Sequence, residues 1–112
     1  MTLFERALLA HLVADWILQN DWMARNKTSL LHPASWTHAT VHGLCLGLAL
    51  GWLGGVVLGI SHLLIDTRVP VNWWFRVFKK CGQAPDAGSI ALWLDQTLHI
   101  ICIAAWLALV KG

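Results

Sequence analysis

The feature that most constrains this chain is a set of histidine and aspartate pairs, spaced four residues apart within apolar segments. Each of four apolar segments carries one pair, and the pairs read HLVAD, HATVH, HLLID and DQTLH. In an α-helix this spacing puts both side chains of a pair on one face, about one turn apart. Histidine and aspartate together make up only 11 of the 112 residues. Chance pairing therefore explains the pattern poorly.

The composition indicates a small membrane protein. Hydrophobic residues make up 57% of the chain and charged residues 12%, and the mean hydropathy is +0.59. Soluble domains have about 25% charged residues. A formal net charge of +2 is too small to suggest a nucleic-acid partner. We therefore expect one all-α membrane domain over residues 1–112, folded as an integral membrane four-helix bundle.

The segments between loops define the expected helices. Hydrophobic runs, glycines and prolines predict helices over residues 2–19, 35–53, 56–69 and 89–110. Gly54–Gly55 is expected to form the turn between the second and third helices. An aromatic and basic stretch over residues 71–81 is typical of an amphipathic segment lying at a membrane interface.

The distribution of basic residues predicts an orientation in the membrane. The first loop carries Arg25 and Lys27, and the opposite side has only Arg6 and Lys111. The third loop adds four more cations: Arg68, Arg76, Lys79 and Lys80. The positive-inside rule then places the first and third loops in the cytoplasm. We expect a multi-pass protein of the bacterial inner membrane.

The paired residues are expected to meet in one half of the bundle. With helices running alternately up and down, all of the pairs fall towards the side of the first and third loops. The predicted ligands are His11, Asp15, His38, His42, His62, Asp66, Asp95 and His99. Buried aspartates are costly in a membrane, and a bound cation would compensate for them. Imidazoles with carboxylates suit Zn²⁺ first, or Fe or Mn, and eight ligands suit two ions.

A two-metal site of this kind is suited to hydrolysing phosphate esters. We expect a metal-dependent hydrolase that acts on a phosphate ester or lipid-linked substrate at the cytoplasmic leaflet, with Asp95 and Asp66 as catalytic residues. Gln19 extends the stripe of His11 and Asp15 by one turn, and Gln96 adjoins Asp95. Each is either a support for the ligands or an ordinary interfacial residue. Arg68, two residues after Asp66, is a candidate for gripping phosphate, and anchoring at the interface is the alternative.

Other functions fit the same residues. A non-enzymatic membrane effector or assembly subunit, of phage or prophage type, would use the His/Asp network only to fasten its helices. Oxidative di-iron chemistry also uses paired histidines, and metal or proton transport is a weaker possibility. Membrane lipids are expected partners, and the small size of the bundle favours a homo-oligomer or a larger membrane partner.

The same motifs resemble a known family. HLVADWILQNDWMARNK, HATVH, HLLID and LDQTLH are similar to the small bacterial and phage membrane proteins of the domain-of-unknown-function family 3307. The family pattern maps onto His11, Asp15, Gln19, Asp21, Trp22, Lys27, His38, His42, His62, Asp66, Asp95, Gln96 and His99. The resemblance implies a membrane domain and a phage or prophage origin, but no activity. A more distant similarity is to membrane-bound metal-dependent hydrolases.

Overall fold

Four long helical segments make up the body of the molecule. A computed structural model describes residues 1–79 and 85–111, and over these residues it contains six α-helices, two π-helical segments and no strand. The long segments are α1 (Leu3–Leu12) continued by η1 (Val13–Ile17), α3 (Pro33–Leu50), α4 (Trp52–Asp66) and α6 (Ala87–Lys111). The short segments are α2 (Asp21–Asn26), α5 (Val69–Trp74) and η2 (Phe75–Lys79). The expected all-α class is confirmed.

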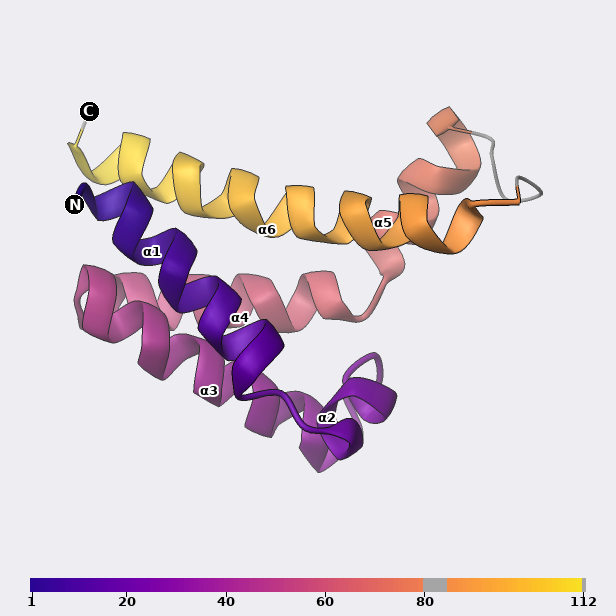
Figure 1. Cartoon of the computed structure of the whole chain (residues 1–112), viewed down its shortest axis with the longest axis horizontal. Coiled ribbons are helices and arrows are strands. Elements are labelled where there is room, and N and C mark those ends of the chain that lie inside the picture. The colour runs from indigo at the N-terminus through magenta and orange to yellow at the C-terminus, as the bar shows by residue number, and fades with distance from the viewer. Residues whose placement is uncertain (80–84, 112) are drawn as a thin grey trace.

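The long helices run alternately in opposite directions. Both termini and the α3–α4 turn lie at one end of the molecule, whereas α2 and α5 lie at the other end (Figure 1). We call the second end the loop end. This alternation brings the late part of α1, the early part of α3, the late part of α4 and the early part of α6 to similar heights.

Local signals set the ends of the helices. The Thr2 hydroxyl accepts a hydrogen bond from the backbone N–H of Glu5 and so caps α1. His32 caps α3 in the same way through Nδ1, and Pro33 occupies the first turn. Gly51 ends α3 with a φ of 97°, a conformation that glycine adopts without strain. The α3–α4 turn therefore lies at Gly51, and the prediction of a turn at Gly54–Gly55 was wrong.

Gly55 serves close packing instead of a turn. A Cβ atom built on Gly55 would lie 2.5 Å from the carbonyl oxygen of Gly43 and 2.8 Å from the Cα of Gly47. Gly59 likewise faces Gly43, where a Cβ would lie 3.2 Å from the Cα. Only hydrogen side chains allow the two backbones to approach so closely. We call this contact between α3 and α4 the glycine seam.

Two further segments differ from the sequence-based expectation. The first loop contains α2, because the Asn20 side chain caps Met23 and starts a short helix. The predicted interfacial segment forms α5 and η2 up to Lys79, and it exposes Trp73 and Phe78. Its last residues, 80–81, lie outside the described part of the chain.

The lengths of the helices support the predicted membrane spans only in part. Among the described residues, Ala87–Val110 of α6 is the one single helix long and apolar enough to cross a membrane. Trp52–Asp66 and Val69–Lys79 pass the same test together, with a bend of 52° between them. Helix α4 alone has 15 residues, too few for a straight span of about 20.

Candidate metal centre

The paired residues form two adjacent layers in the interior of the bundle. Because neighbouring long helices run in opposite directions, four-residue steps along each helix stack side chains at matching heights. The histidine layer consists of His11, His42, His62 and His99, and the carboxylate layer consists of Asp15, His38, Asp66 and Asp95. One turn on the other side of the histidines lies the apolar layer: Ala7, Leu46, Leu58 and Ile103. The carboxylate layer is the one nearest the loop end.

All eight residues of the histidine and carboxylate layers are buried, with at most 5% of each exposed. The structure thus brings together every residue that the sequence predicts as a metal ligand. An isolated buried carboxylate is very costly, so three of them require compensation by protons or cations. The sequence explains the proximity through helix direction and pair spacing alone.

Three histidines surround one oxygen of Asp15. The Asp15 Oδ1 atom lies 3.0 Å from Nε2 of His42, 3.1 Å from Nε2 of His38 and 3.8 Å from Nε2 of His62. A tetrahedral zinc ion with bonds of about 2.0–2.1 Å places its ligand atoms about 3.3 Å apart. The spacing of these four atoms is therefore compatible with a single ion among them.

Asp66 faces both sides of the centre. Its Oδ2 atom lies 2.7 Å from Nε2 of His62 and 3.4 Å from Nε2 of His38. Its Oδ1 atom lies 3.2 Å from Nε2 of His99. His62, Asp66 and His99 form a second group with ligand atoms within 4.8 Å of one another. Asp66 thus has one oxygen towards His38 and His62 of the first group and the other towards His99 of the second.

If His62 and His99 are both neutral, they have too few N–H groups to donate a hydrogen bond in each of their close contacts with one another and with Asp66. The two Nδ1 atoms lie 3.1 Å apart, so in a neutral pair one of them carries hydrogen and the other accepts it. One of the two rings then presents an Nε2 lone pair to an oxygen of Asp66, at 2.7 or 3.2 Å. Nε2 of His62 and Oδ2 of Asp66 indeed have no hydrogen-bond partner. An added proton or a bound cation removes this repulsion.

Gln96 connects the two layers. Its Oε1 lies 2.9 Å from Nε2 of His11, and its Nε2 donates to Oδ2 of Asp15 at 2.9 Å. The Gln96 amide therefore bonds to Oδ2 of Asp15, and Oδ1 of the same carboxylate faces the three histidines. Gln96 has the contacts of a residue that orients ligands.

The remaining predicted residues lie at the edge of the centre. Oδ1 of Asp95 lies 3.6 Å from Nε2 of His99 and has no hydrogen-bond partner. Gln19 follows η1 and is half-buried, and no hydrogen bond joins it to the two layers. Arg68 begins α5 at the loop end with a left-handed φ of 68°, and its Nε is buried without a hydrogen-bond partner.

The chemistry of the donor set fits transition-metal ions. Imidazole nitrogens and carboxylate oxygens are the usual ligands of zinc, iron and manganese. Nε2 of His62, Oδ2 of Asp66 and Oδ1 of Asp95 are buried donor atoms of this kind without a hydrogen-bond partner. Nδ1 of His38 and of His42 also lack partners, although ligating histidines usually donate through their second nitrogen. A cavity of about 10 Å³ beside His42 and Ser61 is close to the smallest that holds one water, which could supply such a partner.

Sequence reasoning missed two features that shape the centre. Asp15 lies on η1, where Leu18 bonds to the carbonyl of Val13 instead of Ala14. Such wide turns are frequent at functional sites and leave no clear mark in a sequence. The Ser35 hydroxyl lies 3.0 Å from the carbonyl oxygen of Asn26 and also contacts the carbonyl of Ser29, so it ties the end of α2 and the turn after it to the start of α3. A serine in a first turn reads as a cap, which hid this role.

Comparison with known proteins gives one match. The sequence model of a family described as "Protein of unknown function (DUF3307)" matches residues 3–111. The chain belongs to the DUF3307 family. The resemblance noted from the motifs is thus confirmed, and the family description assigns no activity. No curated protein and no solved structure is significantly similar to this DUF3307 protein.

Proposed function

We propose that this DUF3307 protein is a membrane-embedded metal-dependent hydrolase of the bacterial inner membrane. The distribution of side chains supports the membrane location. Apart from glycines, 21 residues are buried in the part of the chain that the structure describes, and ten of them are polar or charged. Large apolar side chains face outward on every long helix, among them Trp16, Leu48, Ile60 and Trp93. A polar interior within an apolar surface suits a lipid environment better than water.

The charges support the orientation proposed from the sequence. Cations on the described residues of the loop end are Arg25, Lys27, Arg68, Arg76 and Lys79. Trp73 and Trp74 on α5 are exposed beside them, as expected of residues at a headgroup interface. In this proposal the loop end faces the cytoplasm, and the carboxylate layer lies beneath it.

The centre would hold two divalent ions, with zinc the first choice and iron or manganese the alternatives. The observation that carries this proposal is Asp66, whose two oxygens face separate sets of imidazole nitrogens at 2.7–3.4 Å. Asp15, His38, His42 and His62 would hold one ion, and Asp66 and His99 would help to hold the other, with Asp95 beside His99. Two ions also offset the three buried carboxylates of the carboxylate layer.

The proposed reaction is hydrolysis of a phosphate ester in a lipid or lipid-linked substrate. Divalent ions supply acidified water and stabilise a leaving oxygen when they are bound. Oδ1 of Asp95 is buried without a partner and is free to accept a proton from the attacking water. Arg68 at the loop end would hold the phosphate, and the absence of an internal partner for its Nε supports this role.

A second candidate function is a structural metal centre in a non-enzymatic membrane subunit. The closure of the site favours it, since each candidate ligand is at most 5% exposed. In a subunit of this kind, the ions or protons would only fasten α1 and α6 to the other helices. Loss of Asp95 would then reduce stability without any separate effect on turnover.

The first experiment is elemental analysis of protein purified in detergent without chelator or nickel resin. We expect about two equivalents of metal in the wild type, and a loss of metal in His42→Ala. The matched control is His32→Asn, because asparagine preserves the cap that His32 gives to α3. Absence of metal from folded wild-type protein contradicts the proposal.

Hydrolysis is tested separately from metal binding. Wild type and Asp95→Asn are compared for phosphate release from lipid phosphate monoesters such as phosphatidic acid in mixed micelles. The hydrolase proposal expects Asp95→Asn to remain folded and to retain most metal while losing turnover. Metal-loaded wild-type protein that releases no phosphate from this substrate class favours the structural centre.

A further inference from the structure

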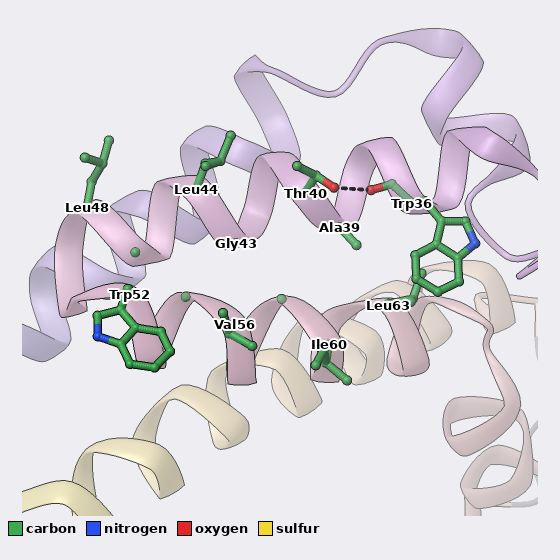
Figure 2. Close-up of a pocket in the computed structure, with 13 residues that line it drawn as sticks. Trp36, Ala39, Thr40, Gly43, Leu44, Leu48, Trp52, Val56, Ile60 and Leu63 are labelled. Carbon is green, nitrogen blue, oxygen red and sulfur yellow. Dashed lines mark hydrogen bonds between the residues drawn. The ribbon is translucent and has the colours of Figure 1, made fainter.

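A long apolar groove follows the outer side of the glycine seam. It has a volume of about 770 Å³ and lies between α3 and α4. Figure 2 shows Leu44 and Leu48 along one side, Val56 and Ile60 along the other, and Trp36 and Trp52 towards opposite ends. The groove is open, since Trp36 is 56% and Trp52 77% exposed.

The lining of the groove excludes a polar occupant. It contains no charged side chain, and the hydroxyl of Thr40 is already used in a hydrogen bond to the carbonyl of Trp36 at 2.7 Å. Glycines Gly43, Gly47, Gly55 and Gly59 belong to the lining at the seam, where the absence of side chains leaves the space open. The matching occupant is slender, flexible and hydrocarbon in character.

The length of the groove fits one leaflet of a membrane. From Trp36 to Leu48 the helix advances about 18 Å at ~1.5 Å per residue. Half of a hydrocarbon core of about 30 Å is ~15 Å. An acyl chain that enters beside Trp36 can therefore lie along the groove within its own leaflet.

The charges at one end identify the headgroup. Trp36 lies in the first turn of α3, and its Nε1 donates to the carbonyl of Leu30 in the connection from α2. That end of the groove is the loop end, which carries Lys27, Arg68 and Arg25, the last paired with Asp21 at 2.9 Å. Among the described residues, the opposite end of the molecule has two basic residues, Arg6 and Lys111, against five at the loop end. The asymmetry complements an anionic headgroup at the Trp36 end.

The groove and the candidate metal centre share the same two helices. Ala39 and Leu63 line the groove, and their neighbours in sequence, His38 and His62, point into the centre. A headgroup held at the Trp36 end thus lies at the same end of the bundle as the carboxylate layer and Arg68. The acyl chain of a lipid substrate could therefore lie in the groove while its phosphate stays at the loop end.

We infer that the α3–α4 groove binds one acyl chain of an anionic phospholipid, with the phosphate at the Trp36 end. This inference rests on the proposed function, for which it names the substrate class and the chain-binding site. Bulk lipid is as apolar as the groove, so selectivity comes from close packing and from the cations that hold the headgroup.

Photocrosslinking tests the inference in the full chain. The protein is reconstituted in vesicles of phosphatidylethanolamine and phosphatidylglycerol with a trace of phosphatidic acid that carries a diazirine on one acyl chain. We expect the label to concentrate on groove residues of α3 and α4, relative to exposed residues of α6 such as Trp93 and Ile101. Unlabelled phosphatidic acid should compete more strongly than phosphatidylcholine.

Val56→Trp fills the groove, and Val57→Trp is the matched control, since Val57 is exposed on the same helix but does not line the groove. We expect groove labelling to fall severalfold in Val56→Trp, because the indole ring takes up space that the acyl chain would occupy, and to stay unchanged in Val57→Trp. If Val56→Trp does not fold, Ile60→Trp serves as the second filling variant.

Three results overturn the inference. Label spread evenly over all lipid-facing helices means ordinary surrounding lipid, and unchanged labelling in a folded filling variant means that the chain lies elsewhere. Groove labelling that falls as the ratio of protein to lipid rises means that a second copy occupies the groove. Elemental analysis of the same samples keeps the two proposals apart, because wild-type protein without metal contradicts the metal centre and leaves the labelling result to decide the groove.

Discussion

Along the glycine seam, two helices meet through backbone contact, whereas α1 and α6 meet the rest of the bundle largely through buried polar groups. A Cβ on Gly55 would lie 2.5 Å from the carbonyl oxygen of Gly43, so the seam has no room for adjustment. Asp15 on η1, by contrast, reaches His38 and His42 on α3 through contacts of 3.0–3.1 Å. The stability of the seam depends on steric fit alone, whereas the stability of the polar layers depends on how many protons or cations they bind. The two regions should therefore respond differently to chelation.

The largest effect is expected at Asp66. Asp66→Ala removes the carboxylate that contacts His38, His62 and His99. Removing one partner of a buried charged network typically costs about 3–5 kcal/mol. We expect a fall of that size in the free energy of unfolding, measured by denaturation in mixed micelles, together with loss of bound metal.

Asp86→Asn is the control for Asp66→Ala, because Asp86 is an exposed aspartate directly before α6, and asparagine can cap a helix as aspartate does. It should leave both quantities unchanged. A cost for Asp66→Ala that is the same before and after chelation would show that the carboxylate acts without an ion.

The seam is tested by Gly55→Ala. The new methyl group would collide with the backbone of α3 at Gly43 and Gly47, which cannot move aside like a flexible side chain. Overpacking of this kind typically costs about 1–3 kcal/mol. We expect the same loss of stability with and without chelator. A loss that disappears on chelation would mean that the seam and the polar layers form one cooperative unit.

A smaller effect is expected at Gln96, which contacts two of the predicted ligands without being one of them. Gln96→Leu leaves Nε2 of His11 and Oδ2 of Asp15 without their amide partner. Loss of such a contact typically lowers metal affinity about 10–100-fold. Competition with a calibrated chelator measures the change. Thr97→Val is the control on the neighbouring exposed position, and equal affinities in the two variants would contradict a role in orienting the ligands.

Much of the centre was predictable because pair spacing and helix direction together determine height. His11 with Asp15 and His62 with Asp66 are one turn apart within their helices, and alternating directions bring these turns level. The contacts themselves were not predictable in the same way. His42 shares a sequence pair with His38, yet both rings contact Asp15 of another segment. Such partners depend on helix rotation and on the wide turn at η1.

The turn between α3 and α4 was misplaced for a physical reason. Glycine suits a turn because it accepts positive φ, and it suits a helix contact because it has no side chain. Gly51 has the first role, with a φ of 97°, and Gly55 has the second. The sequence shows the same residue in both places, so only the packing of the two helices separates the roles. Residues 80–84 and 112 lie outside the described part and do not enter this comparison.

The smallest effect is expected at Gly47, and it distinguishes the α3 side of the glycine seam from the α4 side. A Cβ on Gly47 would lie 3.8 Å from the Cα of Gly55, an ordinary contact distance. Alanine is a better helix former than glycine by about 0.5–1 kcal/mol, so Gly47→Ala should leave stability unchanged or raise it by that amount. The free energy of unfolding of Gly55→Ala, measured in the same denaturation experiment, should be lower than that of the wild type. If both variants lose stability equally, then the seam tolerates no methyl group on either helix, and the close approach extends further towards the α3–α4 turn than the geometry at Gly55 requires.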